Sequence, residues 1–178
     1  MAERTLVLIK PDGVSKSLTG EIILRIERTG LKLVAAKMVK ASEEELEKHY
    51  RLEEEWAKEL MEKSKSAAEK EGREFPYSNH MELGAEIQGR LKNFLKEGPI
   101  VAMVFEGNHA VEIVRKMVGH TEPKQAGPGT IRGDFVVDSY KLADGENRAV
   151  RNLIHASSDV NEARREIEVW FGDNEIFG

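Results

Sequence analysis

The sequence predicts an α+β sandwich of the ferredoxin-like type, in which helices cover an antiparallel sheet. Apolar β-rich runs alternate with stretches of helical spacing in the order strand, helix, strand, helices, strand, helix, strand, helix, which fits two split βαβ units. The chain has 178 residues, 40% of them hydrophobic, which suffices for the core of one domain. The same order of elements also fits a doubly wound parallel sheet, so that alternative stays open on these observations.

The first third of the chain is expected to hold a strand, a helix and a second strand. Thr5 to Ile9 is an apolar, β-rich run that ends at the turn signal Pro11-Asp12-Gly13, so we predict a buried strand. A helix follows and stops at Gly30, before a second strand over Leu31 to Val39. The apolar residues that give this helix its spacing are Ile22, Ile23 and Ile26.

The next segment is predicted to be mainly helical. Ser42-x-x-Glu45 is a capping box that opens a long, mostly exposed helix running to about Lys70. Its apolar stripe consists of Leu46, Tyr50, Ala57, Leu60 and Met61. After a loop over Gly72 to Asn79, another helix ends at Gly98-Pro99. That helix is marked by Ile87, Leu91, Phe94 and Leu95.

The last part of the chain is predicted to alternate strands and helices. An apolar strand over Ile100 to Phe105 is followed by a helix that Asn108 can cap. The buried side of this helix carries Val111, Val114, Met117 and Val118. A loop rich in proline and glycine leads to a strand over Phe135 to Tyr140. A second capping box, Asp159-x-x-Glu162, opens the final helix, whose apolar residues include Ile167 and Trp170.

Composition and charge limit the possible functions. A net charge of −5 argues against a general polyanion-binding surface, so we expect no nucleic acid partner and only a local cation cluster for any phosphate. The absence of cysteine excludes disulfides and a thiolate nucleophile and permits a reducing compartment. The sequence shows no signal-type segment and no stretch of membrane-spanning length. We therefore predict a cytoplasmic protein without membrane contact, folded as one domain over residues 1–178.

Four separated motifs carry groups that suit phosphoryl transfer. Asn152 to Ser157 places His155, a possible phosphate acceptor, between an amide and a hydroxyl. Lys10 ends the first strand, Arg115 precedes Gly119-His120-Thr121, and Arg132 lies in the run Gly129 to Phe135. The sequence contains no P-loop, and the glycines between positions 127 and 133 do not fit a dinucleotide fingerprint. The three cations must therefore hold phosphates mainly through their side chains.

These motifs, in this order, resemble the nucleoside diphosphate kinase family. The similarity runs from Arg4 to about Phe171 and is strongest over Thr5 to Val14 and Gly129 to Phe135. It implies the ferredoxin-like fold rather than the parallel sheet. It also implies a ping-pong reaction, in which the γ-phosphoryl of ATP or another nucleoside triphosphate moves onto a histidine and then onto a nucleoside diphosphate. The resemblance further implies Mg²⁺ held mainly by the nucleotide phosphates, without metal ligands from the protein, and a homo-oligomer, either a tetramer or a hexamer.

The resemblance gives each candidate residue a role that the residue alone does not require. The residues it implies for catalysis are His155, Lys10, Tyr50, Ser157 and Glu166. The residues it implies for nucleotide binding are Lys10, Ile87, Arg115, Thr121, Arg132 and Asn152. In the family His155 is the nucleophile, the Tyr50 hydroxyl reaches it, and Glu166 orients it together with Ser157. Without the resemblance, Lys10 is explained as a charge at a sheet edge and Glu166 as a surface helix charge.

Three features depart from the family's pattern. The aspartate that usually follows His-Ala-Ser directly lies one place later, at Asp159. The segment after Tyr50 is longer, with an insertion over about residues 53–85, and the position of the usual base-stacking aromatic holds Ile87. Together with Leu91, Ile87 would offer the base only an aliphatic platform. Residues 139–148 lengthen a later connection, which could form an added hairpin or a subunit contact.

Two other functions fit part of the sequence. A ferredoxin-like module could bind nucleotides for regulation without turnover, and an equilibrium binding assay beside a turnover assay separates it from an enzyme. An RNA-binding domain of the same topology would need basic and aromatic residues on its sheet, which the predicted strand Phe135 to Tyr140 lacks. The remaining histidines have no comparable neighbours in sequence, so we expect them to be structural or exposed. They are His49, His80, His109 and His120.

Overall fold

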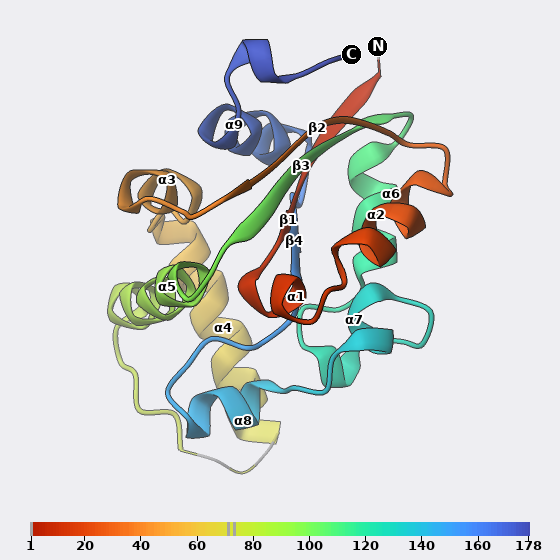
Figure 1. Cartoon of the computed structure of the whole chain (residues 1–178). Coiled ribbons are helices and arrows are strands. Elements are labelled where there is room, and N and C mark those ends of the chain that lie inside the picture. Colours follow the sequence, from red (N-terminus) through yellow and green to blue (C-terminus); the bar gives the residue numbers. More distant parts are fainter. Residues whose placement is uncertain (1, 71, 73) are drawn as a thin grey trace.

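The fold is a four-stranded sheet with helices on both faces (Figure 1). The computed structural model describes residues 2–70, 72 and 74–178. Its strands are β1 (Glu3–Ile9), β2 (Lys32–Val39), β3 (Ile100–Gly107) and β4 (Ile154–Ala156), in the spatial order β2-β3-β1-β4. Each neighbouring pair is antiparallel, which confirms the predicted ferredoxin-like α+β class and excludes the parallel sheet.

Strand β1 lies inside the sheet and is buried on both faces. Leu6, Val7, Leu8 and Ile9 are each 0% exposed. Because side chains alternate along a strand, Val7 and Ile9 pack into one hydrophobic core, and Leu6 and Leu8 pack into the other. One short apolar run therefore serves both cores, which explains why its sequence shows no alternation with polar residues.

A layer of helices covers each face of the sheet (Figure 1). The helices on the face of Val7 and Ile9 are α2 (Thr19–Glu27), α6 (Ala110–Val118) and α7 (Ile131–Phe135). The helices on the opposite face are α3 (Glu43–His49), α5 (His80–Lys96) and α9 (Val160–Trp170). The other described helices are α1 (Pro11–Ser15), α4 (Glu54–Lys70), α8 (Tyr140–Gly145) and the short 3-10 helices η1 (Pro123–Gln125) and η2 (Asp173–Glu175).

Several local signals in the sequence are confirmed. The Ser42 hydroxyl accepts from the Glu45 N–H at 3.2 Å, and the Glu45 carboxylate accepts from the Ser42 N–H at 2.8 Å, which completes the capping box of α3. Gly30 has φ +90° after α2, a conformation that glycine adopts without steric strain. Asp159 caps α9 through two first-turn N–H groups. The Glu162 carboxylate, however, accepts from the N–H one residue earlier than a capping box requires.

The predicted single helix from Ser42 to Lys70 is wrong. Helix α3 ends at His49 and α4 begins at Glu54, after a break in which Tyr50 has φ −96° and ψ 84°. The Gln88 side chain of α5 donates to the Tyr50 carbonyl at 2.5 Å, so a tertiary contact replaces a helical hydrogen bond. Helix α3 packs against α9, whereas α4 packs against α5. Both parts keep helical periodicity, so the pattern alone could not reveal the break.

The starts of α5 and α6 differ in how well the sequence predicted them. Asn79 caps α5 and accepts from a first-turn N–H at 2.8 Å. In the predicted loop Gly72 to Asn79, Arg73 lies outside the described residues, and the others form neither helix nor strand. Asn108 does not cap α6, because the N-cap position is His109, with φ 54°. The carboxylate of Glu3 accepts from a first-turn N–H of α6 at 2.7 Å instead.

The predicted strand over Phe135 to Tyr140 is wrong. Its first residue ends α7, whose start is capped by the Thr130 hydroxyl, and residues 136–139 form no regular element. Val137 is 99% exposed, so this apolar stretch is not a sheet strand. The buried Asp138 carboxylate instead accepts from Arg148 and from the N–H groups of Ser139 and Arg151. Helix α8 occupies the long connection, where an added hairpin was one possibility.

The fourth strand is β4, which the sequence did not reveal. It has three residues and pairs with β1, and it contains His155 opposite Leu8. A strand this short, with a histidine at its centre, gives no usable periodicity. Leu153, directly before it, has φ 63°, an uncommon conformation for a leucine, and its carbonyl accepts from the Lys10 N–H at 2.7 Å. Pairing across 145 or more positions, rather than local propensity, forms this strand.

The chain ends close to where it begins (Figure 1). Trp170 and Phe171 are buried, 1% and 6% exposed, in the core under α9. The following segment lies along β2, where the Phe177 N–H donates to the Val34 carbonyl at 2.8 Å. Among the described helices, none combines the length and the apolar composition that a membrane span requires.

Candidate active site

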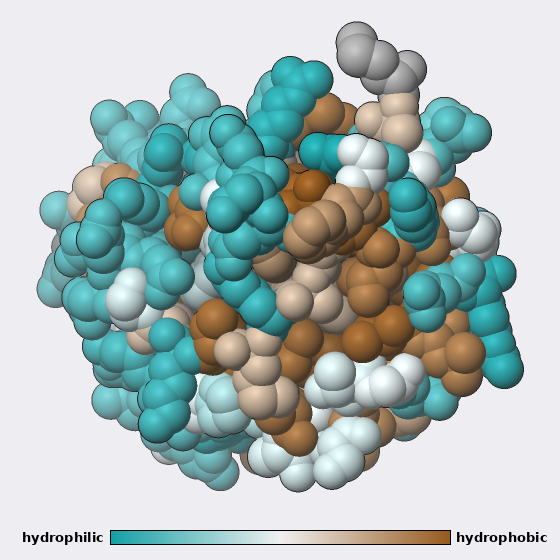
Figure 2. All heavy atoms as spheres, turned by 45° about the horizontal axis from the view of Figure 1, so that its top comes forward, coloured by the Kyte–Doolittle hydropathy of each residue, from teal (hydrophilic) through white to brown (hydrophobic). Residues whose placement is uncertain are grey.

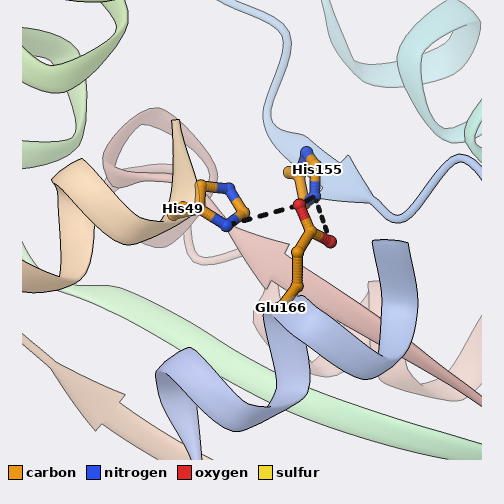
Figure 3. A group of neighbouring side chains, drawn as sticks. All are labelled: His49, His155 and Glu166. Carbon is orange, nitrogen blue, oxygen red and sulfur yellow. Dashed lines mark hydrogen bonds and ion pairs between the residues drawn. The ribbon is translucent and has the colours of Figure 1, made fainter. Parts of the chain in front are cut away.

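His155 sits where its two ring nitrogens have different environments. Because it lies opposite Leu8, its ring projects from the face covered by α3, α5 and α9. Nε2 is 2.9 and 3.0 Å from the two carboxylate oxygens of Glu166, and the other nitrogen turns away from them (Figure 3). Nδ1 forms no hydrogen bond with any described residue. An Nε2–H donated to Glu166 leaves the Nδ1 lone pair available as a nucleophile.

Glu166 is a buried carboxylate that stays ionised. Its side chain is 1% exposed and also accepts from the Ser157 hydroxyl at 2.6 Å. Burial raises its pKa, but the charge and hydrogen bond of His155, with smaller contributions from His49 and Ser157, outweigh burial and lower the pKa to about 2. The carboxylate therefore holds the His155 ring in one orientation at neutral pH, as the resemblance implied.

Lys10 lies at the end of β1, buried beside the site. Its Nζ donates to Asn152 Oδ1 at 2.7 Å and lies 5.5 Å from the centre of the Phe94 ring. Burial, with a smaller contribution from the charge of Arg132 and against the opposing effect of Asp12, lowers the pKa of Lys10 to about 7. The amine is thus only partly protonated at neutral pH, and an approaching phosphate would favour its charged form.

Asn152 and Arg132 connect the loops around the site. The Asn152 side chain accepts from Lys10 and donates to the Thr121 carbonyl at 2.9 Å. Arg132 is 6% exposed, and each of its guanidinium nitrogens donates to a backbone carbonyl, those of Asn152, Gly119 and Ile154. Arg132 therefore fixes the backbone on both sides of β4's start, and the terminal nitrogens each retain one further N–H for a ligand.

Arg115 and Thr121 lie at the surface, close to this cluster. Both are exposed. Burial of Arg132 is the main cause that lowers its pKa to about 10, and the charge of the nearby Arg115 contributes to the same shift. Within the described part of the chain, Arg115 forms no ion pair. Two like charges held close together favour an anion between them.

A cleft of about 800 Å³ opens beside His155. The residues that line it are His49, Tyr50, Arg51, Glu53, Trp56, Gln88, Leu91, His155, Asp159, Val160, Asn161, Glu162, Arg165 and Glu166. Ile87, the expected base platform, is not among them, although its helix contributes Leu91. Tyr50 is at the cleft, but its hydroxyl forms no hydrogen bond to His155 in the described structure. Its ring packs on His49, with ring centres 4.6 Å apart.

The chain is similar to known proteins along almost its whole length. Residues 3–68 and 58–176 match the family model described as nucleoside diphosphate kinase. The chain belongs to the nucleoside diphosphate kinase family. It is 48% identical to a nucleoside diphosphate kinase of Pyrobaculum aerophilum, over 98% of this chain and 97% of the relative. It is 38% identical to one from Borreliella burgdorferi, over 99% of this chain and 91% of the relative.

Solved structures of the same family show the same fold. A crystal structure of an NDP kinase from Pyrobaculum aerophilum superposes with a TM-score of 0.95 at 46% identity, covering 100% of both chains. A transition-state mimic of the nucleoside-diphosphate kinase from Borrelia burgdorferi, with bound vanadate and ADP, gives a TM-score of 0.79 at 37% identity. It covers 99% of this chain and 91% of that one. That kinase therefore holds a nucleotide and a phosphate analogue on this fold.

Two residues near the nucleophile were not anticipated as members of the kinase site. His49, expected to be structural or exposed, is buried against His155 and Glu166. Its position three residues after Leu46 on α3 placed it on the buried helix face, which was a usable signal. Trp56, at the start of α4, lines the cleft. It belongs to the insertion, so the family pattern gave no reason to consider it.

Proposed function

We propose that this member of the family catalyses the nucleoside diphosphate kinase reaction with His155 as phosphoryl acceptor. The observation that carries the proposal is that Glu166 holds Nε2 of His155, which leaves Nδ1 free of described partners. The Nδ1 lone pair attacks the γ-phosphorus of a nucleoside triphosphate, and the bond to the bridging oxygen breaks with its electrons leaving on the diphosphate. A phosphate oxygen of a second nucleoside diphosphate then attacks the phosphohistidine in the reverse sense.

The cations act on the charge that moves in this reaction. We infer that Lys10 and Arg115 meet the phosphate oxygens, and that the N–H groups of Arg132 left over from its carbonyl contacts add hydrogen bonds to that charge. We also propose that Mg²⁺ is held mainly by the nucleotide phosphates, where it would neutralise charge on their oxygens.

We also propose that the chain works as a homo-oligomer, a tetramer or a hexamer. Figure 2 shows apolar side chains gathered on the face where β2 and α2 lie, and the exposed hydrophobic residues of these elements are Met38 and Leu24, 61% and 42% exposed. Strand β2 is also an edge of the sheet. An apolar sheet edge, on which the C-terminal segment forms one described backbone hydrogen bond, supports association with a second copy. The cytoplasmic location remains a prediction.

The test is to incubate the protein with labelled ATP and Mg²⁺ and to follow the phosphoenzyme. We expect a phosphoenzyme stable in alkali and lost in mild acid, because protonation of the ring makes imidazole a good leaving group. His155→Ala should abolish both the phosphoenzyme and turnover with several nucleoside diphosphates, while Ser158→Ala serves as the control and should keep them. An acid-stable phosphoenzyme, or one that persists in His155→Ala, would assign the phosphate to a serine.

A further inference from the structure

His49 lies inside the site but takes no part in the proposed chemistry. Its side chain is 0% exposed, and three rings enclose it. The His155 ring meets it in a T-shaped contact, with ring centres 4.7 Å apart and planes at 80°. The rings of Tyr50 and Trp170 make T-shaped contacts at 4.6 and 5.7 Å. A ring packed this closely restricts the rotation of the His155 ring.

The hydrogen bonds of His49 assign its tautomer. An indole N–H can only donate, and that of Trp170 donates to His49 Nδ1 at 3.3 Å. Burial, together with the charge of His155, lowers the pKa of His49 to about 3, so the ring is neutral at neutral pH. Its one proton must then lie on Nε2. That nitrogen is buried and has no hydrogen-bond partner among residues 2–70, 72 and 74–178.

In this tautomer His49 does not donate to Glu166, so the carboxylate remains available as the hydrogen-bond acceptor for His155. The Glu166 carboxylate lies 3.3 Å from His49 Nδ1, which has a lone pair and no proton to donate (Figure 3). A cation or a donor at position 49 would compete with His155 for the carboxylate, whereas a neutral acceptor does not. A buried N–H without a hydrogen-bond partner, as His49 has, lowers the stability of the fold. Such a cost beside a nucleophile points to a role for His49 in the function of the site.

We propose that His49 is a positioning residue, whose neutral ring, held by Trp170, fixes the plane of His155 so that Nε2 stays on Glu166 and Nδ1 faces the cleft. The inference rests on the proposed function, because it concerns the rate at which His155 is phosphorylated. The shape and the neutrality of the His49 ring are what orient His155. A phenylalanine at position 49 should therefore replace it in large part, and an alanine should not.

The test compares His49→Ala and His49→Phe by the rate constant for phosphoenzyme formation and by the dissociation constant for ADP. We expect His49→Ala to lower the rate constant by about 10- to 100-fold, through misorientation of the nucleophile, while ADP affinity changes by less than about twofold. His49→Phe should recover the rate to within about threefold of the wild type. Leu46→Ala, which removes a 0% exposed side chain from the same helix, is the matched control for lost stability.

Each other outcome has a defined meaning. A His49→Ala rate within about twofold of the wild type, or a loss that Leu46→Ala reproduces per folded molecule, overturns the positioning role. So does a His49→Phe variant no faster than His49→Ala, and so does a ring ¹⁵N NMR spectrum that places the proton on Nδ1. If His49→Ala does not fold, His49→Leu, which fills the volume without a ring, takes its place. A wild-type chain that forms no phosphoenzyme refutes the proposed function instead.

Discussion

Two buried ionisable residues at the site, Glu166 and Lys10, have shifted pKa values that suit different roles. Glu166 has a pKa lowered to about 2, chiefly because the neighbouring His155 outweighs burial, so it remains an anion that orients the ring. Lys10 has a pKa lowered to about 7, chiefly by burial, so its charge depends on what binds beside it. The fixed anion serves positioning, and the titratable cation suits a charge that moves during the reaction.

Nucleotide binding should therefore take up a proton at Lys10. At pH 8 a lysine with a pKa of about 7 is mostly neutral in the free protein, and a bound phosphate raises that pKa by favouring the charged form. Affinity for ADP should fall as the pH rises above about 7. Isothermal titration at pH 8 in buffers of different ionisation enthalpy measures the uptake, which we expect to approach one proton per site. Lys10→Met is the control, and equal uptake in that variant would contradict the assignment.

At the scale of elements, short connections determine the site more than the long helices do. Arg132, in the short helix α7, bonds the carbonyls of Gly119, Asn152 and Ile154, which joins the end of α6 to the start of β4. The break after α3 brings Tyr50 to the cleft. Helix α4 then places Trp56 in the cleft wall, where an aliphatic platform of Ile87 and Leu91 was expected.

We predict that Trp56 meets the base of a bound nucleotide. The chain has two tryptophans, and Trp170 is 1% exposed, so a change of tryptophan fluorescence on ADP binding should come from Trp56. Trp56→Phe should remove the change, and Trp170→Phe should keep it. Trp56→Ala should weaken ADP binding by about tenfold, the lower end of a base-stacking contribution. A signal that persists in Trp56→Phe would place the base elsewhere.

Stacking on an indole face tolerates every base, so we predict weak discrimination among GDP, CDP, UDP and dGDP. The candidate contacts around Lys10 and Asn152 are to phosphate and to the 3′ side of the sugar, which ribose and deoxyribose nucleotides share. Specificity constants from one coupled assay measure the preference. A preference for one base by more than about a thousandfold would require polar readers that this explanation does not include.

At the scale of the whole molecule, apolar surface remains exposed after folding. Trp170 and Phe171, near the C-terminus, are buried in the core. Phe177 is 74% exposed, and Met38 and Leu24 lie on the face of β2 and α2. That the whole chain folds as one domain, with additions at about residues 53–85 and 139–148, stays a prediction.

We expect light scattering at micromolar concentration to give the mass of a tetramer or a hexamer. Met38→Asp together with Leu24→Asp should reduce that mass, because buried carboxylates without partners oppose association. Lys65→Asp, on an exposed position of α4, is the control for the change of charge and should keep the assembly. A monomeric wild type would refute the assembly. An unchanged mass in the double variant would place the contact on another face.

The sequence by itself determined the features encoded by near neighbours. The β1 run, the stop at Gly30 and the caps at Ser42 and Asp159 each depend on a few adjacent residues, so periodicity and capping chemistry predicted them. The motif around His155, together with Lys10, Arg115 and Arg132, likewise indicated phosphoryl transfer from residue types, and the resemblance extended that to a family.

Only the tertiary structure decided how those groups meet. The bond from Lys10 to Asn152 spans 142 positions, and that from Trp170 to His49 spans 121. Strand β4 exists because β1 pairs with it, and Val137 stays exposed because no partner strand covers it. Local propensity carries no information about such distant contacts, since burial and pairing are properties of the assembled core. For the same reason, the sequence suggested His155 as the nucleophile, and the helical position of His49 could indicate its burial but not its packing against His155.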